Sequence, residues 1–321
     1  MFIKPRMRLA PDDTSFKFMR GRIAGLVVSA ILSTASIALF FYPGLNLGID
    51  FSGGIVMEVR TDGPADFQKI RQTLAAEHIP DQGVQRFGDD STVLIRLPTQ
   101  STEAGTQVAV TKVRTALEKS FAGARIVRTD AVGASVSAEL FRNGLLALGI
   151  SLLMILAYIW FRFEWQFAVG AVVTLILDIT KAVGFLVITR IEFDLVMVAA
   201  ILTILGYSTN DKVVVYDRVR ENLRRYRTMP LRELIDLSIN ETLNRTLGTS
   251  MTVFLASLPL ALFGGASISG FAWVMLFGIV VGTSSSIFIA APILLFLGEN
   301  RLRRDTVAAE TPDAAATPTE P

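Results

Sequence analysis

The sequence predicts an α-helical integral membrane protein with six transmembrane helices and a small ferredoxin-like α+β domain between the first and second of them. Six long apolar stretches predict the helices, and one polar segment with alternating apolar residues predicts the domain. The chain has 321 residues, of which 51% are hydrophobic and 19% are charged, and its mean hydropathy is +0.48. Soluble domains carry about 25% charged residues, so this composition argues against a water-soluble enzyme.

Composition also narrows the possible chemistry. The formal net charge of +2 is too balanced for a nucleic-acid-binding protein, whose basic surface is large and concentrated. The lack of cysteine excludes disulfides and thiolate metal sites, and the single histidine, His78, excludes a multi-histidine metal site. We expect His78 to be an ordinary surface or capping residue, and we expect no cofactor. The phosphate-binding loop G-x-x-x-x-G-K-[ST] is missing from the sequence, so the expected energy source is not ATP.

The six spans follow from their length, because about 20 apolar residues cross a bilayer. They are residues 23–42, 144–161, 167–189, 195–216, 247–263 and 271–297. The first is longer than the roughly 7–15 apolar residues of a signal peptide, so we expect it to be retained. Basic residues are concentrated in 1–22, in 218–245 and after residue 300, and the positive-inside rule places both termini in the cytoplasm.

Residues 43–139 then lie outside the membrane, on the other side from the termini. Alternating apolar residues predict four strands, at 55–59, 84–87, 93–97 and 125–129, and helix-spaced apolar residues predict two helices, starting near 67 and 110. The order β-α-β-β-α-β is that of a ferredoxin-like split βαβ unit.

Two further segments lie on the cytoplasmic side. Residues 218–245 are amphipathic, and the spacing of Leu231, Leu234, Ile235 and Leu237 predicts a helix lying on the membrane surface. Residues 301–321 are a polar tail for which we expect disorder.

Ionisable residues inside the spans are the most informative signal, because an aspartate near a span's centre costs about 2.5–3.5 kcal/mol on insertion scales. Asp211 lies in a polar patch of the fourth span with Tyr207 and Asn210, and Arg245 enters the fifth span from the cytoplasmic side. With Asp178 of the third span, these residues predict a proton pathway. Burial raises a carboxyl pKa and a nearby arginine lowers it, so a carboxylate that alternates between such environments takes up and releases a proton.

Two simpler interpretations stay open. The charges hold helices together, or Asp178 and Lys181, three residues apart, only neutralise each other. Lys212 points about 100° away from Asp211 around the helix, so it is not expected to neutralise its neighbour.

The last span contains a motif of small residues. Gly278 and Gly282 form G-x-x-x-G, which predicts close helix packing, either within this chain or against a partner.

Three stretches carry a resemblance to a known family. They are LGIDFSGG at 47–54, GYSTNDKVVVYDRVREN at 206–222 and ETLNRT at 241–246. Together with six spans and one large loop after the first, they resemble the SecF members of the SecD/SecF family. This family serves bacterial protein export and is related to the resistance–nodulation–division transporters. The resemblance covers nearly the whole chain outside its tails.

The resemblance implies a proton-driven subunit that helps preproteins cross the bacterial cytoplasmic (inner) membrane, with the domain at 43–139 in the periplasm. The implied partners are SecD as a heterodimer, the SecYEG channel, YajC, the preprotein and the lipid bilayer. By motif position, Asp211 and Arg245 match residues linked in the family to proton flow, and Asp178 matches an aspartate of the third span. Lys181 and Lys212 stand where the family usually has uncharged residues, which leaves open whether the coupling ion is a proton.

The leading hypothesis is that protonation of Asp211 weakens its pairing with Arg245, so that the helices shift and move the outer domain attached to the first two spans. A small-molecule efflux subunit of the same superfamily is one alternative, although the outer segment is small for a porter domain. An intramembrane aspartyl protease is another, since Asp178 with Asp211 or Asp217 supplies two aspartates. Its Gly-x-Gly-Asp motif is missing from the sequence.

Overall fold

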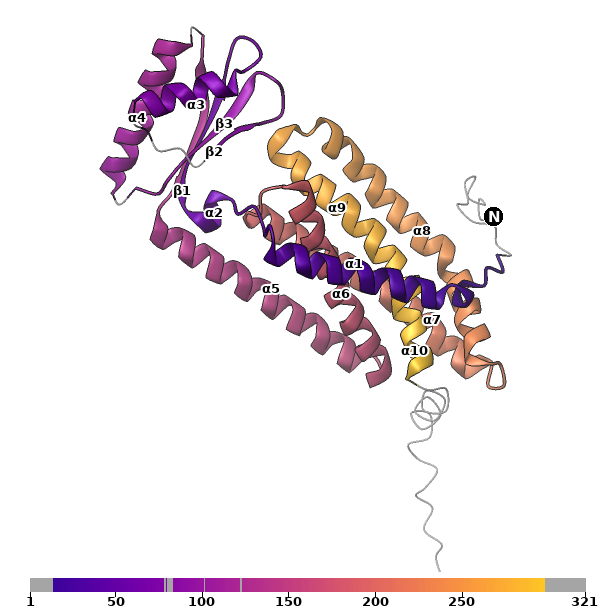
Figure 1. Ribbon diagram of the computed structural model, residues 1–321. Helices are drawn as coiled ribbons and strands as arrows, with labels where there is room; N and C mark the ends of the chain where they lie inside the picture. The colour runs from indigo at the N-terminus through magenta and orange to yellow at the C-terminus, as the bar shows by residue number, and fades with distance from the viewer. Residues whose placement is uncertain (1–13, 78, 80–82, 101, 122, 298–321) are drawn as a thin grey trace, which may run out of the picture.

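The computed structural model describes residues 14–77, 79, 83–100, 102–121 and 123–297. Within them, six helices are long and apolar enough to cross a membrane, and a four-stranded sheet with its helices lies beyond one end of the bundle (Figure 1). The predicted fold class is therefore confirmed. His78 and the tail 301–321 lie outside the described residues.

Three of the long helical segments form the interior of the bundle and three surround them. The segments are α1 (Arg22–Phe41), α5 (Ala134–Arg162), α6 (Trp165–Thr189), α7 (Leu195–Arg225), α8 (Leu231–Phe263), and a last rod made of α9 (Gly265–Ser285), η2 (Ser286–Ala290) and α10 (Ala291–Phe296). A short turn, η1 (Phe18–Arg20), precedes α1. The apolar windows of α6, α7 and the last rod are 50–61% buried within the chain, against 11–17% for α1, α5 and α8. The outer three therefore present the apolar faces that suit lipid.

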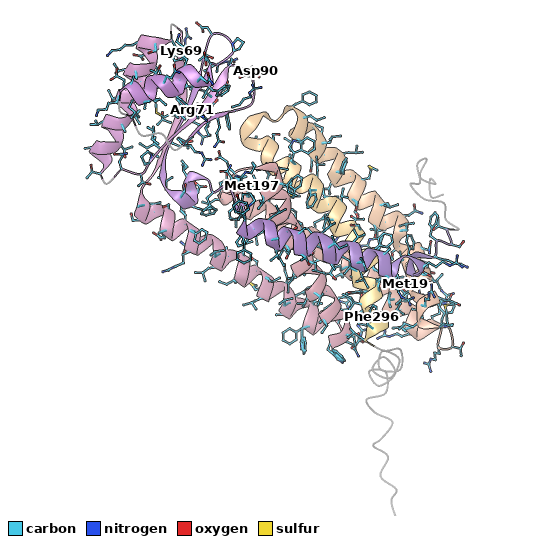
Figure 2. All side chains as sticks on the ribbon, in the orientation of Figure 1. Met19, Lys69, Arg71, Asp90, Met197 and Phe296 are labelled. Atoms are coloured by element: carbon cyan, nitrogen blue, oxygen red, sulfur yellow. The ribbon has the colours of Figure 1, made fainter. Side chains whose placement is uncertain are left out.

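Figure 2 marks the two ends of this bundle, with Met197 near the α+β domain and Met19 and Phe296 at the far end. The last rod is not a regular α-helix throughout. Its segment η2 is a single π-helical turn, which is wider than an α-helical turn and often occurs at functional sites.

The α+β domain has the predicted topology. Its strands are β1 (Gly54–Arg60), β2 (Gly83–Arg86), β3 (Thr92–Leu97) and β4 (Arg125–Val132), and its helices are α3 (Phe67–Ala76) and α4 (Glu103–Ser120). The sheet order is β2-β3-β1-β4 with every neighbouring pair antiparallel. Met57 and Ile95 of the sheet pack with Ile70 of α3 and Leu117 of α4 in a core separate from that of the bundle.

The structure corrects two predicted boundaries. Helix α5 begins at Ala134, well before residue 144, and its first turns lie next to the α+β domain. The predicted surface helix at 218–245 is wrong as a separate element, since α7 continues to Arg225 and α8 begins at Leu231. Leu234 and Ile235 of that stretch are buried in the main core. The apolar stripe that we expected to lie on lipid is covered by protein instead.

Backbone hydrogen bonds connect the α+β domain to the turn between α6 and α7. The amide of Gly48 donates to the carbonyl oxygen of Phe193 at 2.9 Å, and the amide of Phe193 donates to the carbonyl oxygen of Asn46 at 2.7 Å. Asp50, in the short helix α2 (Ile49–Ser52), accepts from the amide of Leu195 at 3.1 Å. We call this connection, between residues 44–52 and 190–195, the joint.

Arg96 of β3 adds a side-chain contact to the joint. It donates to the carbonyl oxygen of Leu47 at 3.0 Å and forms an ion pair with Glu192, and only 10% of its side chain is exposed. At Gly48 the backbone comes close to the turn, because a Cβ there would lie 3.1 Å from the side chain of Asp194. The domain is thus attached to α6 and α7 as well as to α1 and α5.

Candidate functional site

Helix α7 presents two neighbouring polar faces to the interior of the bundle. Ser208 and Lys212 share one face and contact α6, whereas Tyr207 and Asp211 share the other and face α8. The spacing of four residues in each pair explains why each pair points in one direction. The patch at 206–212 is therefore two sites that lie back to back.

Asp178 is the centre of the site that faces α6. Its Oδ2 accepts hydrogen bonds from the hydroxyls of Ser208 at 2.8 Å and Ser285 at 2.7 Å, and from Nζ of Lys212 at 3.0 Å. Its Oδ1 lies 3.4 Å from Nζ of Lys181. All five side chains are buried. The predicted contact between Asp178 and Lys181 is present, but Lys212 is the nearer cation.

The charges in this region balance only when Asp211 is counted. Asp178 faces two ammonium groups, so the cluster by itself carries one excess positive charge when all three groups are ionised. An uncompensated buried charge is costly. Asp211 precedes Lys212 in the chain, and in its ionised form it would supply a second negative charge nearby. Protonation of Asp211 therefore changes the balance around both lysines.

Asp211 itself lies between α8 and the π-helical turn. It is 5% exposed, and the hydroxyls of Thr246 of α8 and Ser286 of η2 lie beside its carboxylate. Neither Oδ2 of Asp211 nor Oγ1 of Thr246 has a hydrogen-bond partner among the described residues. Ser286 donates to the carbonyl oxygen of Gly282 at 2.9 Å. Two buried polar atoms of neighbouring side chains therefore have no hydrogen-bond partner among the described residues.

The other predicted residues of the fourth span lie in different surroundings. The hydroxyl of Tyr207 donates to Oγ of Ser250 in α8 at 2.6 Å, and that atom lies 2.7 Å from Oγ1 of Thr283 in α9. Asn210 is exposed on the surface of the bundle. The structure therefore places Tyr207 in a chain of hydroxyl groups next to Asp211, and Asn210 outside it.

The expected pairing of Asp211 with Arg245 is absent from this conformation. Arg245 is exposed, and the described residues contain no ion pair between the two side chains. The reason is helical phase: Thr246 faces α7, and the preceding residue points about 100° away. The residue of α8 that sequence reasoning overlooked at this place is Thr246.

The two small residues of the last span bring α9 against α7 within this chain. A Cβ on Gly278 would lie 2.4 Å from the side chain of Ile204, and a Cβ on Gly282 would lie 3.1 Å from Oγ of Ser208. This close approach allows Ser285 to reach Asp178. The π-helical turn that follows leaves the carbonyl oxygen of Ala290 to accept from the hydroxyl of Tyr216 at 3.1 Å.

The arrangement does not suit an aspartyl protease. Such an enzyme needs two aspartates that face each other, whereas Asp178 faces Lys212 and Asp211 faces Thr246. Asp217 lies further along α7, where it pairs with Arg162 at 2.9 Å.

The fold and its site define a multi-pass membrane protein in which interior helices carry buried charges and an attached α+β domain stands outside the bundle. Two family models match the chain: "Protein export membrane protein SecD/SecF, C-terminal" over residues 112–300, and "SecD/SecF GG Motif" over residues 38–65. The second match contains the domain's half of the backbone joint.

Relatives and solved structures agree with these matches. Protein translocase subunit SecF of Rickettsia bellii is 42% identical over 93% of this chain and 98% of its own length. Protein translocase subunit SecDF of Brucella abortus is 43% identical over 97% of this chain and 41% of its own. The crystal structure of SecDF, a translocon-associated membrane protein from Thermus thermophilus, has a TM-score of 0.83 at 31% identity and covers 92% of this chain.

The chain belongs to the SecD/SecF family and has the role of an accessory subunit of the Sec protein translocase. It spans 40% of the Thermus SecDF chain. Because SecDF relatives join the two subunits in one polypeptide, they support association of this chain with SecD.

Proposed function

We propose that this subunit uses the proton gradient across the bacterial inner membrane to assist preprotein export, together with SecD, the SecYEG channel and YajC. Both termini lie in the cytoplasm and the α+β domain in the periplasm. One elementary charge that crosses 100 mV supplies about 2.3 kcal/mol. This energy is of the size needed to rearrange one buried polar contact.

The observation that carries the proposal is that Asp211 is buried beside Thr246 and forms no ion pair among the described residues. An ionised carboxylate can only accept hydrogen bonds, whereas a protonated one also donates. Oδ2 of Asp211 and Oγ1 of Thr246 are both buried without a partner among the described residues, and the Thr246 hydroxyl can donate to an ionised Asp211 or accept from a protonated one. An ionised carboxylate that is buried without a paired cation is costly, and the threonine can partner either form, so the site suits reversible uptake and release of a proton.

Arg245 belongs to the other state in this proposal. When Asp211 loses its proton, the new negative charge attracts the arginine one residue before Thr246, and α8 rotates to bring it inward. The exposed position of Arg245 is what the proposal requires while Asp211 carries a proton. Two arrangements of α8 against α7 then alternate with one proton.

The joint offers the route from this rearrangement to the α+β domain. Asp178 and Asp211 lie on α6 and α7, and the turn that links these two helices is hydrogen-bonded to residues 44–52. A shift of α7 against α8 therefore moves the support of the domain. The ion pair of Arg96 with Glu192 adds a side-chain contact to these backbone hydrogen bonds.

The test uses Asp211→Asn in the full chain, reconstituted with its partners in vesicles. Asparagine keeps the shape of the side chain and cannot exchange the proton, so we expect the gradient-dependent part of preprotein export to fall to the level without a gradient. Export without a gradient should persist. Asp62→Asn makes the same chemical change at an exposed site of the α+β domain and serves as the matched control. Full gradient dependence in Asp211→Asn would refute the proposal.

A further inference from the structure

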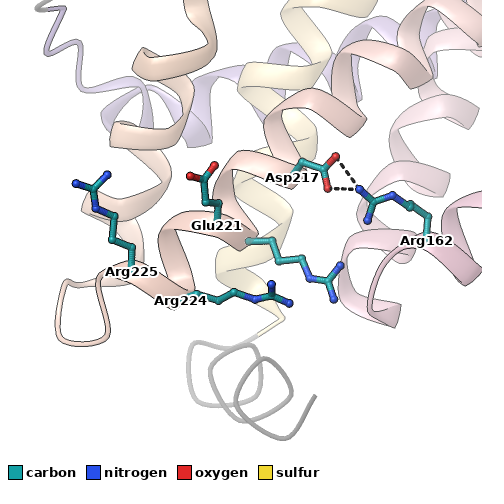
Figure 3. A pocket seen from close by; sticks show the side chains of 6 residues that line it. Arg162, Asp217, Glu221, Arg224 and Arg225 are labelled. Atoms are coloured by element: carbon teal, nitrogen blue, oxygen red, sulfur yellow. Dashed lines mark hydrogen bonds and ion pairs between the residues drawn. The ribbon is translucent and has the colours of Figure 1, made fainter. Parts of the chain in front are cut away.

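A cavity lined only by charged side chains lies where α5 ends beside α7 (Figure 3). Its volume is about 480 Å³, and it opens to the surface. We call it the arginine pocket, and its lining residues are Arg162, Asp217, Arg220, Glu221, Arg224 and Arg225. Four arginines face two carboxylates, which leaves a net charge of +2 at neutral pH.

Acidic partners hold two of the arginines in place. Nη2 of Arg162 lies 2.9 and 3.1 Å from the two carboxylate oxygens of Asp217, and its guanidinium lies 5.0 Å from the ring centre of Phe163. Arg220 pairs with Glu164 at 3.1 Å. A guanidinium carries five N–H donors, so one carboxylate does not saturate it. With Glu164 included, positive charge still exceeds negative charge, and the pocket keeps the capacity for one more anion.

The surroundings of the pocket place it at the level of lipid headgroups. Trp160 is 61% exposed and Phe161 is 90% exposed at the end of α5, next to Arg162. Aromatic side chains of this kind gather at the interface between membrane and water. Tyr158 lies one turn before Arg162 on the same side of α5, and Met154 lies one turn before Tyr158. Both are exposed, so an apolar strip leads from the middle of the bilayer to the pocket.

We propose that the arginine pocket binds the phosphate group of an anionic phospholipid whose acyl chains lie along the exposed side of α5. A guanidinium group can donate two parallel hydrogen bonds to two oxygens of one phosphate group, and it is more weakly hydrated than an ammonium group. A zwitterionic lipid brings its own cation, which the excess positive charge repels. Free phosphate offers the same headgroup chemistry, but only a lipid has chains to cover the strip that contains Met154 and Tyr158.

The test compares lipids and arginines in the full chain purified in detergent. Retained lipid is counted by native mass spectrometry after addition of phosphatidylglycerol or phosphatidylcholine, with inorganic phosphate as a competitor. In Arg224→Gln/Arg225→Gln we expect affinity for phosphatidylglycerol to fall about 30-fold, equivalent to about 2 kcal/mol, since each arginine near an anionic lipid contributes about half of that. Arg227→Gln/Arg232→Gln removes the same charge outside the pocket lining and should bind as the parent does.

Each other outcome counts against a specific part of the proposal. Equal binding of the two lipids by the parent protein would overturn the charge argument. An equal loss of affinity in the control variant would show that basic charge acts in general, and would overturn the assignment of binding to the arginine pocket. Complete displacement of phosphatidylglycerol by millimolar phosphate would show that the pocket binds small anions, and would overturn the proposal that a phospholipid occupies it. Arg162→Lys keeps the positive charge but loses the planar guanidinium group, so this variant should bind phosphatidylglycerol with intermediate affinity. Circular dichroism checks that each variant is folded.

Discussion

Asp178 shows how one buried carboxylate holds three interior segments together. Its partners come from α6 itself, from α7 and from the end of α9. A buried ion pair adds little stability compared with apolar packing, yet removing one partner is strongly destabilising because the other charge remains in a medium of low polarity. The cluster therefore specifies how α6, α7 and α9 are rotated against one another.

This dependence predicts a marked loss in Asp178→Asn. The side chain of Lys212 is 0% exposed, so its ammonium would lose its counter-charge without gaining water. We expect the free energy of unfolding in detergent to fall by about 3–5 kcal/mol. The double variant Asp178→Asn/Lys212→Met removes the stranded charge and should recover a large part of the loss. Denaturant titration of both variants, with exposed Lys112→Met as the control, measures this, and strictly additive losses would contradict it.

Single residues differ in how much the sequence reveals about them. Asp178 and Asp211 stand out because a charge inside an apolar run is costly in a membrane and therefore rare. Their partners do not stand out, because Lys212 and Thr246 reach them across helix interfaces whose rotation the sequence leaves undetermined. The angle of about 100° between consecutive residues of an α-helix is nevertheless informative. It places the side chains of Asp211 and Lys212 on different sides of α7, and it places those of Arg245 and Thr246 on different sides of α8.

At the level of elements, the joint depends on the side chains that reinforce its backbone hydrogen bonds. Arg96 and Glu192 are 10% and 33% exposed, so their ion pair is screened less than a pair in open water. We expect Arg96→Glu and Glu192→Arg each to weaken the joint by about 1–3 kcal/mol, the range for hydrogen bonds to charged groups. Amide exchange at Gly48 and Phe193, which are bonded across the joint, reports this directly.

The exchanged pair Arg96→Glu/Glu192→Arg is the critical control for this prediction. It restores opposite charges across the same contact and should return most of the amide protection. Protection that stays low in the double variant would mean that size or burial, and not charge, accounts for the effect. Unchanged protection in both single variants would remove Arg96 from the joint altogether.

The joint should also respond to pH through Asp194, which caps α7 by accepting from the amide of Met197 at 2.9 Å. Burial, followed by the nearby charges of Asp50 and Glu192, raises the pKa of Asp194 above its usual 3.8, against the opposing effect of the Met197 hydrogen bond. A raised carboxyl pKa means that the folded state favours the protonated form. That contribution is complete below the unfolded pKa and is lost as pH rises through the folded value.

Asp194→Asn is neutral at every pH and keeps a capping oxygen. We therefore expect it to be more stable than the parent at pH 7, by up to about 1 kcal/mol as for other partly solvated charges. The difference should shrink as the pH falls toward the usual aspartate value. Thermal unfolding of both proteins across this range decides the matter, and a variant that is less stable at pH 7 would show that the cap needs the full charge.

The existence and order of the helices and strands were predictable from length and periodicity, whereas their ends were less predictable. The six long helices and the βαββαβ order follow from apolar spacing, because burial of one face imposes that spacing. The continuation of α7 to Arg225 was missed, since the amphipathic pattern of 218–245 suits a lipid surface as well as a neighbouring helix. The π-helical turn at Ser286–Ala290 was also missed, because its residues are equally compatible with a regular α-helix.

On the scale of the whole molecule, the charges and the lipid-facing surfaces are segregated. The buried charges lie on α6 and α7, which belong to the interior set, while α1, α5 and α8 turn mostly apolar side chains outward. The α+β domain has its own core and meets the bundle through α2, the joint and the two covalent connections. Such a construction lets the domain move as a unit when its support moves.

Composition and span length predicted this general architecture from the sequence alone. The attachment of the domain to α6 and α7 was not predictable, because Asn46 and Phe193 are far apart in the chain and bond through their backbones. Backbone contacts leave little trace in side-chain patterns. The glycine at position 48, where the chain passes close to Asp194, was the one local sign of this contact.

The orientation of the molecule in the membrane gives the last prediction. The positive-inside rule places the connection between α7 and α8, which is flanked by arginines, in the cytoplasm, and the α+β domain on the other side. Because the natural chain contains no cysteine, a single introduced cysteine can be labelled without background. Asp62→Cys in the domain and Thr228→Cys in the connection are both at exposed positions. A membrane-impermeant maleimide should label Asp62→Cys in spheroplasts and Thr228→Cys only in inverted vesicles. The reverse pattern would invert the proposed topology and, with it, the proposed direction of proton movement.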